Sequence, residues 1–332
     1  MVPVVIEKCP IPIIWIDTSV ITNMTIARTS PRQLEKSLYE RVQNLYTQVK
    51  EASRKGQVIC PLSSQEQEVW INRNDWLDTI HDLGLGITCS CRKNIQDAQL
   101  HAAMKAYSSQ SKKINLSYRD MFDSDPVKEV NSILGEPVFV TVRQGVFQGA
   151  DYQRSKKEEL IKSLNMQRIR NVQNKVKFPE QLKKERIGDL EALLISLNEI
   201  SKGIESSEDG INNFFGYSEL MDQTKAWNYY SGKNEDLPGL IEFYKSEYNN
   251  SIPYTNLSAH MYAKIMVDPQ EIKSGDPMDI EHASGMLPYV DLYITDKHWR
   301  TFLNQKKFGD IYGTKVCYIS DDEKIQKFFS EL

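Results

Sequence analysis

The chain has 332 residues, of which 40% are hydrophobic and 26% are charged, and its formal net charge at pH 7 is −4. This length predicts about two domains. Because the chain as a whole is acidic, any contact with nucleic acid must use a local basic surface. No apolar run approaches the roughly 20 residues that cross a bilayer, so we expect no membrane partner.

The N-terminus and the cysteines favour a cytoplasmic protein. Glu7, Lys8 and several prolines interrupt the first apolar residues, whereas a signal peptide has a continuous apolar centre. The five cysteines are odd in number and contain no CxxC pair. This pattern favours reduced thiols over a disulfide framework or a zinc site.

The first predicted strand is the apolar run Ile11–Ile16, which ends at Asp17. An aspartate at this place is commonly a helix cap or a turn residue. A carboxylate that directly follows a fully apolar strand is nevertheless a candidate functional group. Ser30 then starts a predicted helix with a capping-box pattern, and Gly56 should end it.

The same order of elements then repeats. Val58–Cys60 predicts a second strand, and Ser63 begins another capping-box pattern. Glu66 occupies the acidic position of that capping box, so Glu68 is the preferred functional acid and Glu66 the alternative. Alternating strands and helices predict an α/β fold with a mostly parallel sheet.

Residues 91–250 are predicted to form a largely helical insertion or second lobe. The helical patterns cover Gln96–Tyr107, Lys156–Val176, Leu182–Lys202 and Leu237–Tyr248, and Val138–Val142 is a candidate strand.

A local basic excess occurs within this insertion, where residues 151–186 hold 11 Lys or Arg against 5 Asp or Glu. A solvated helix face commonly explains such a run. Contact with a phosphate backbone is the functional alternative. The candidate nucleic-acid-binding residues are Lys156, Lys157, Arg168, Arg170, Lys183 and Lys184.

Further acids surround a predicted buried strand near the C-terminus, Val290–Thr295. Asp291 lies at the start of this strand and Asp296 just past its end. Asp279 lies on the preceding helix, where the small Ala283 one turn later allows close packing on the sheet.

Four of these acids are predicted to share one edge of the sheet: Asp17, Glu68, Asp279 and Asp296. Open α/β sheets bind ligands at this carboxyl edge. Carboxylates gathered there repel one another unless a cation neutralises them, and their oxygens suit Mg²⁺ or Mn²⁺. Two such ions about 3.5–4 Å apart can activate water for phosphodiester hydrolysis.

Three segments together resemble PIN-domain nucleases: IIWIDTSVI, VICPLSSQEQEVW and DPMDIEHASGMLPYVDLYITDKHW. The resemblance covers roughly the first 80 and the last 75 residues. It implies a PIN-like three-layer fold, built from residues 1–90 together with 251–332, and an Mg²⁺- or Mn²⁺-dependent endoribonuclease acting on single-stranded or structured RNA. The long middle of the chain has no counterpart in a compact PIN domain.

The resemblance also implies roles for individual residues. The four acids would be the metal ligands and the catalytic residues. Thr18 or Ser19 would support Asp17, and Thr295 would help to orient Asp296. His282 and Asp291 depart from the family pattern, and both are candidate supporting residues. His282 could support the site or contact phosphate, or it could be an ordinary helix histidine whose hydrogen bonds are satisfied.

Three functions remain open at this point. The first is the ribonuclease, with a role as a toxin or defence effector suggested by family analogy alone, and with a protein inhibitor or a second copy of the chain as further partners. The second is a catalytically inactive PIN-like module that binds RNA or protein. The third is a metal-dependent phosphatase on a related sheet. The sequence contains no GxxxxGK[ST], HExxH or GxSxG motif.

Overall fold

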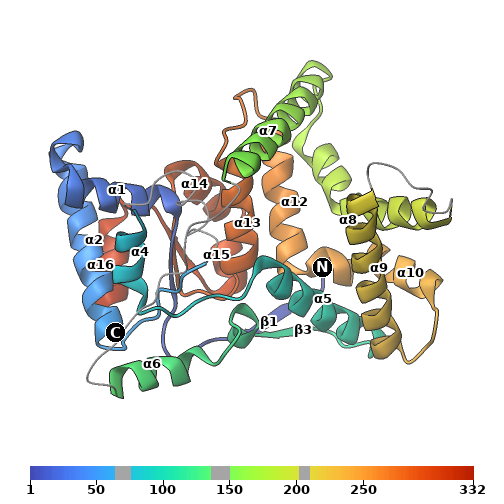
Figure 1. Ribbon diagram of the computed structural model, residues 1–332, viewed down its shortest axis with the longest axis horizontal. Coiled ribbons are helices and arrows are strands. Elements are labelled where there is room, and N and C mark those ends of the chain that lie inside the picture. The colour runs from blue at the N-terminus through green and yellow to red at the C-terminus, as the bar shows by residue number, and fades with distance from the viewer. Residues whose placement is uncertain (64–75, 136–149, 202–209) are drawn as a thin grey trace. The chain divides into compact units, whose positions relative to one another are not determined.

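The computed structural model describes residues 1–63, 76–135, 150–201 and 210–332, and it is a mixed α/β protein in which helices predominate (Figure 1). The chain divides into two compact units. Unit 1 comprises Met1–Val5, Gln96–Leu116 and Ile161–Asp276, and unit 2 comprises Ile6–Ile95, Ser117–Leu160 and Pro277–Leu332.

Unit 2 is built around a parallel sheet with the strand order β2-β4-β5. The strands are β2 (Ile14–Ile16), β4 (Leu292–Ile294) and β5 (Lys315–Cys317). Every residue of β2 and β4 is buried, which explains why these strands read as continuous apolar runs. The predicted α/β class is therefore confirmed.

The sheet continues on the other side of β2 through shorter pairings. Ile13 bridges Ile59 and Leu62 bridges Thr88, both in parallel orientation. The Ile14 N–H donates to the Ile59 carbonyl over 2.8 Å. The chain thus leaves β2 toward one side and returns on the other side at β4. This reversal between β2 and β4 is a topological switch point, where open α/β sheets form their ligand crevice.

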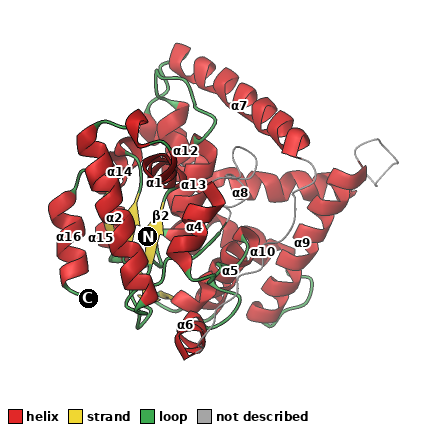
Figure 2. Cartoon of the chain, turned by 60° about the vertical axis from the view of Figure 1, so that its left-hand side comes forward, coloured by secondary structure: helices red, strands yellow, loops and turns green. Residues whose placement is uncertain are grey.

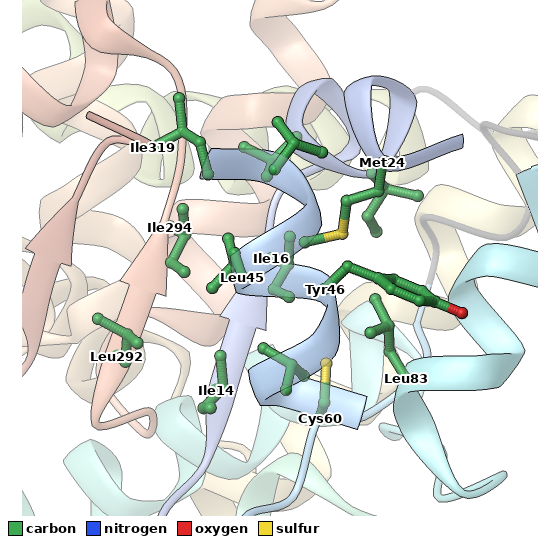
Figure 3. Close-up of a cluster of buried hydrophobic side chains, with 14 of the residues drawn as sticks. Ile14, Ile16, Met24, Leu45, Tyr46, Cys60, Leu83, Leu292, Ile294 and Ile319 are labelled. Carbon is green, nitrogen blue, oxygen red and sulfur yellow. The ribbon is translucent and has the colours of Figure 1, made fainter. Parts of the chain in front are cut away.

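Helices of unit 2 enclose its short strands (Figure 2). One sheet face carries Ile14, Ile16, Leu292 and Ile294, which form a buried cluster with side chains from helices such as α2 (Figure 3). The helices that contribute to this cluster are α1 (Thr18–Thr29), α2 (Lys36–Arg54), α4 (Leu77–Gly84) and α16 (Asp322–Ser330).

Neighbouring residues of a strand point to opposite faces, so Trp15 and Tyr293 lie on the other face of the sheet. There the Trp15 ring lies 5.3 Å from the ring of His282 on α13 (Asp276–Met286). The remaining described elements assigned wholly to unit 2 are η1 (Pro31–Gln33), η3 (Tyr118–Met121), α6 (Pro126–Gly135), α14 (Lys297–Gln305) and α15 (Phe308–Tyr312).

Unit 1 is mainly helical. Tyr107, Trp227 and Phe243 form an aromatic cluster with ring separations of 5.6–5.8 Å. Its elements, some of which begin or end outside the unit, are β1 (Val4–Glu7), α5 (Arg92–Ser108), β3 (Ile114–Ser117), α7 (Ala150–Gln173), α8 (Phe178–Ser201), α9 (Gly210–Ser231), α10 (Leu237–Lys245), α11 (Glu247–Ser251) and α12 (Pro253–Met266).

The boundaries of the units differ from the predicted division of the chain. Residues 251–276, expected in the nuclease core, belong to unit 1 because α12 packs against α8. Ser117–Leu160, expected in the insertion, belongs to unit 2. The candidate strand Val138–Val142 lies outside the described residues. In the described part of the chain, no helix is both long enough and apolar enough to cross a bilayer.

Candidate active site

Asp17 and Asp296 lie at the carboxyl ends of neighbouring parallel strands. Asp17 directly follows β2, and its N–H donates to the Ile294 carbonyl, at the end of β4, over 2.9 Å. Thr295 and Asp296 follow β4. The two acids therefore lie at the carboxyl edge of the sheet, as predicted from the strand pattern, and this part of the edge is also the switch point.

The chain turns from β2 into α1 at Asp17, which is almost fully buried, with 1% exposure. The Asp17 carbonyl accepts from the Val20 N–H over 2.9 Å, which begins the helix. A carboxylate oxygen of Asp17 accepts from the Ser19 hydroxyl over 2.7 Å. Of the two predicted supporting residues, Ser19 is thus the one with an observed bond to this carboxylate. Thr18 is also buried.

Asp296 caps the helix that follows β4. Its Oδ1 accepts from the backbone N–H of Trp299 over 2.8 Å, at the N-terminus of α14. Thr295 is buried, and its N–H donates to the Cys317 carbonyl over 3.0 Å. Thr295 thus continues the pairing of β4 with β5 and fixes the backbone immediately before Asp296.

Asp279 reaches the same region from α13. Its Oδ2 accepts from the indole Nε1–H of Trp299 over 3.2 Å. Trp299 therefore binds Asp296 through its backbone and Asp279 through its side chain. The sequence did not predict that Trp299 connects the two acids. Asp296, three residues before Trp299, is a recognisable helix cap, but nothing in the sequence indicates the contact with Asp279, which is twenty residues away.

The acids near the end of β4 affect the pKa of the Tyr293 hydroxyl. Burial raises the pKa of its hydroxyl well above the usual value, and three nearby carboxylates raise it further. These carboxylates belong to Asp17, Asp279 and Asp296. The described structure thus brings three of the four predicted acids around the end of β4.

The fourth acid, Glu68, and its alternative Glu66 lie outside the described residues. His282, the predicted supporting histidine, is buried with 1% exposure on α13, against Trp15. This position puts it on the same helix as Asp279, one turn further along.

Asp291 requires a correction, because it lies at the opposite edge of the sheet. Its Oδ2 accepts from the Ile13 N–H over 2.8 Å, before β2 begins, and it precedes β4. Burial raises the pKa of Asp291, although the Ile13 hydrogen bond and the charges of Lys8 and Lys315 oppose the rise. Asp291 therefore joins the starts of two strands and does not support the acids at their ends.

The donor chemistry of the three acids suits a hard divalent cation, since carboxylate oxygens are the ligands that Mg²⁺ and Mn²⁺ prefer. Within residues 1–63, 76–135, 150–201 and 210–332, no three His, Cys, Asp or Glu side chains form a ready metal site. Asp279 and Asp296 each have a carboxylate oxygen held by Trp299. A bound ion would thus need ligands in addition to these three carboxylates.

The predicted nucleic-acid-binding residues fall into both units and differ in exposure. Lys156 and Lys157 belong to unit 2 and the others to unit 1. Lys156, Arg170, Lys183 and Lys184 are exposed, whereas Lys157 is half-buried.

Arg168 requires a second correction. It is only 8% exposed, and its Nη1 donates to the carbonyls of Asp268 and Pro269 over 3.2 and 2.8 Å. Its Nε donates to Asn165 over 3.0 Å. Arg168 therefore fastens the segment after α12 to α7 within unit 1, and its donors are not presented to a phosphate.

We expect Arg168→Ala to lower the free energy of unfolding by about 2 kcal/mol, because three hydrogen bonds from a buried charged group are lost. Arg170→Ala, two residues away and exposed, should change it by less than about 0.5 kcal/mol. Urea unfolding of both variants checks this. An effect of Arg168→Ala as small as that expected for Arg170→Ala would show that Arg168 has no structural role.

Comparisons with known proteins identify no relative of this chain. No protein-family model matches the chain, and no curated protein or solved structure matches it.

Proposed function

We propose that the protein is a metal-dependent endoribonuclease that hydrolyses RNA phosphodiester bonds at the carboxyl edge of the unit 2 sheet. One observation carries the proposal. Asp17 and Asp296 end adjacent parallel strands at the switch point, and Asp279 is bound to the residue that also binds Asp296. An acid cluster at this place suits a cation-assisted reaction on a phosphate group.

The arrangement of unit 2 is consistent with the proposed PIN-like three-layer fold. Apolar side chains of α1 and α2 cover one face of the parallel sheet, and His282 of α13 contacts Trp15 on the other. The proposal assigns Glu68 to the same site as a fourth acid. A role as a toxin or defence effector is the biological setting that the family resemblance suggests.

In the proposed reaction, the carboxylates of Asp17, Asp279 and Asp296 would hold Mg²⁺ or Mn²⁺, and the chemistry supplied there would be activation of water and stabilisation of the leaving oxygen. The chain's own residues hold and orient the carboxylates. Ser19 donates to Asp17, and Trp299 donates to both Asp279 and Asp296. Tyr293, on the strand that leads to Asp296, is itself almost fully buried.

The proposal is tested by incubating the purified protein with end-labelled single-stranded RNA and Mn²⁺, with and without EDTA. We expect internal cleavage with Mn²⁺ and none with EDTA. The same preparation is tested on p-nitrophenyl phosphate. Hydrolysis of this monoester without RNA cleavage would favour the phosphatase instead, and RNA binding without cleavage would favour the inactive module.

A further inference from the structure

Trp299 makes two hydrogen bonds to two different acids through two different groups. Its backbone N–H donates to Oδ1 of Asp296 over 2.8 Å, and its indole Nε1–H donates to Oδ2 of Asp279 over 3.2 Å. Twenty positions separate Asp279 from Trp299, so the side-chain bond joins two helices. Both donors belong to the first turn of α14, which follows β4 directly.

The indole is held rigidly in this place. Trp299 is 1% exposed, and its ring contacts His298 and Phe302 edge-on, with centroid separations of 5.1 and 6.0 Å. A buried indole N–H normally requires an acceptor, and a carboxylate is a strong one. The packing thus fixes the Nε1–H, and the Nε1–H in turn fixes one oxygen of Asp279.

We propose that Trp299 is a positioning residue of the active site, which sets the orientation of Asp279 relative to Asp296 for binding of a divalent cation. The inference rests on the proposed function and extends it to a residue outside the predicted acids. Groups that hydrogen-bond to metal-binding carboxylates orient them, and their loss weakens metal affinity or activity by about 10–100-fold.

The test compares two Trp→Phe variants. Trp299→Phe keeps the backbone N–H to Asp296 and most of the aromatic bulk, and it removes only the indole donor to Asp279. The matched control is Trp227→Phe in unit 1, where a 3%-exposed indole Nε1 donates to Asp236 over 3.3 Å. Each variant loses one buried indole–carboxylate bond, so both should lose similar stability.

We expect Trp299→Phe to weaken Mn²⁺ binding by about 10–100-fold, measured by electron paramagnetic resonance of free Mn²⁺, and to require correspondingly more Mn²⁺ for RNA cleavage. Trp227→Phe should match the wild type in both measurements. If Trp299→Phe binds Mn²⁺ and cleaves RNA as the wild type does, the positioning role is wrong and the nuclease stands. If the wild type neither binds Mn²⁺ nor cleaves RNA, both proposals fall.

A measurement on the wild-type protein covers the case in which Trp299→Phe does not fold. Paramagnetic Mn²⁺ broadens nearby resonances, so the indole ¹⁵N–¹H signal of Trp299 should broaden at substoichiometric Mn²⁺. An unaffected Trp299 signal at Mn²⁺ concentrations that saturate the protein would overturn the proposal.

Discussion

Replacement of Asp17 by Asn is expected to lower Mn²⁺-dependent RNA cleavage by more than about 100-fold, because loss of a metal-binding carboxylate should exceed the loss caused by its supporting groups. The substitution should leave the fold intact. Asn can accept the Ser19 hydroxyl bond in place of the carboxylate, and the backbone bond to Ile294 does not involve the side chain.

The matched control for this change is Asp291→Asn, which removes a carboxylate at the opposite edge of the same sheet. Its amide oxygen can still accept from the Ile13 N–H, the bond that the aspartate makes. We expect cleavage by this variant to equal that of the wild type. Cleavage rates over a Mn²⁺ series, with circular dichroism to verify folding, decide the comparison. Equal rates for Asp17→Asn and the wild type would remove Asp17 from the site.

The pH dependence of stability provides a further check on this control. Burial raises the pKa of Asp291 in the folded protein, so the folded state binds this proton more tightly than the unfolded state. Its contribution to stability is therefore present at low pH and is lost as pH rises through the folded pKa. Asp291→Asn should remove that pH dependence, and near pH 7 it should be at least as stable as the wild type in urea.

The positions of Asp17 and Asp296 at the sheet edge were predictable, because a short apolar strand and the residue that follows it can be recognised from neighbouring residues alone. The predicted strand ending at Ile16 is observed as β2, and the predicted Val290–Thr295 is observed as the shorter β4. Asp17 and Asp296 were correctly placed after their strands because the chain continues directly from each strand into a helix. The second predicted strand, Val58–Cys60, forms only the isolated bridge of Ile59.

Features that depend on long-range contacts were not predictable in the same way. The helix expected to begin at Ser30 begins later. A 3₁₀ turn covers Pro31–Gln33, and α2 starts only at Lys36. The basic character of Arg168 predicted a surface residue. Its Nη1 instead donates to two carbonyls that lie 100 and 101 positions further along the chain. Likewise, no sequence pattern indicates that the Trp299 indole reaches Asp279.

The carboxylate of Asp82 on α4 is expected to contribute strongly to the stability of unit 2. It accepts a hydrogen bond from the Tyr46 hydroxyl over 2.5 Å and one from Lys50 over 2.9 Å. The guanidinium groups of Arg28 and Arg54 lie 3.4 and 3.9 Å from its carboxylate. One carboxylate thus joins α4 to both α1 and α2, the helices that cover the apolar face of the sheet.

Removal of this carboxylate leaves three cations facing one another without their shared anion. We expect Asp82→Ala to lower the free energy of unfolding by about 2 kcal/mol, the scale of hydrogen bonds that involve charged groups. Glu40→Ala is the control. It breaks the exposed pair of Glu40 with Lys36, which are separated by 4.0 Å, and should cost less than about 0.5 kcal/mol.

The effect of Asp82 should depend on pH in a defined direction. Burial alone would raise the pKa of Asp82, but hydrogen bonds from Tyr46 and Lys50 and the nearby positive charges outweigh it and hold the pKa below its usual value. Its stabilising contribution is therefore present above the unfolded pKa of about 3.9 and is lost as pH falls through the lower folded pKa. The stability difference between the wild type and Asp82→Asn, measured in urea, should be large at neutral pH and shrink as pH falls below about 4. A difference that stays constant across this range would mean that the Asp82 charge does not hold the three helices together.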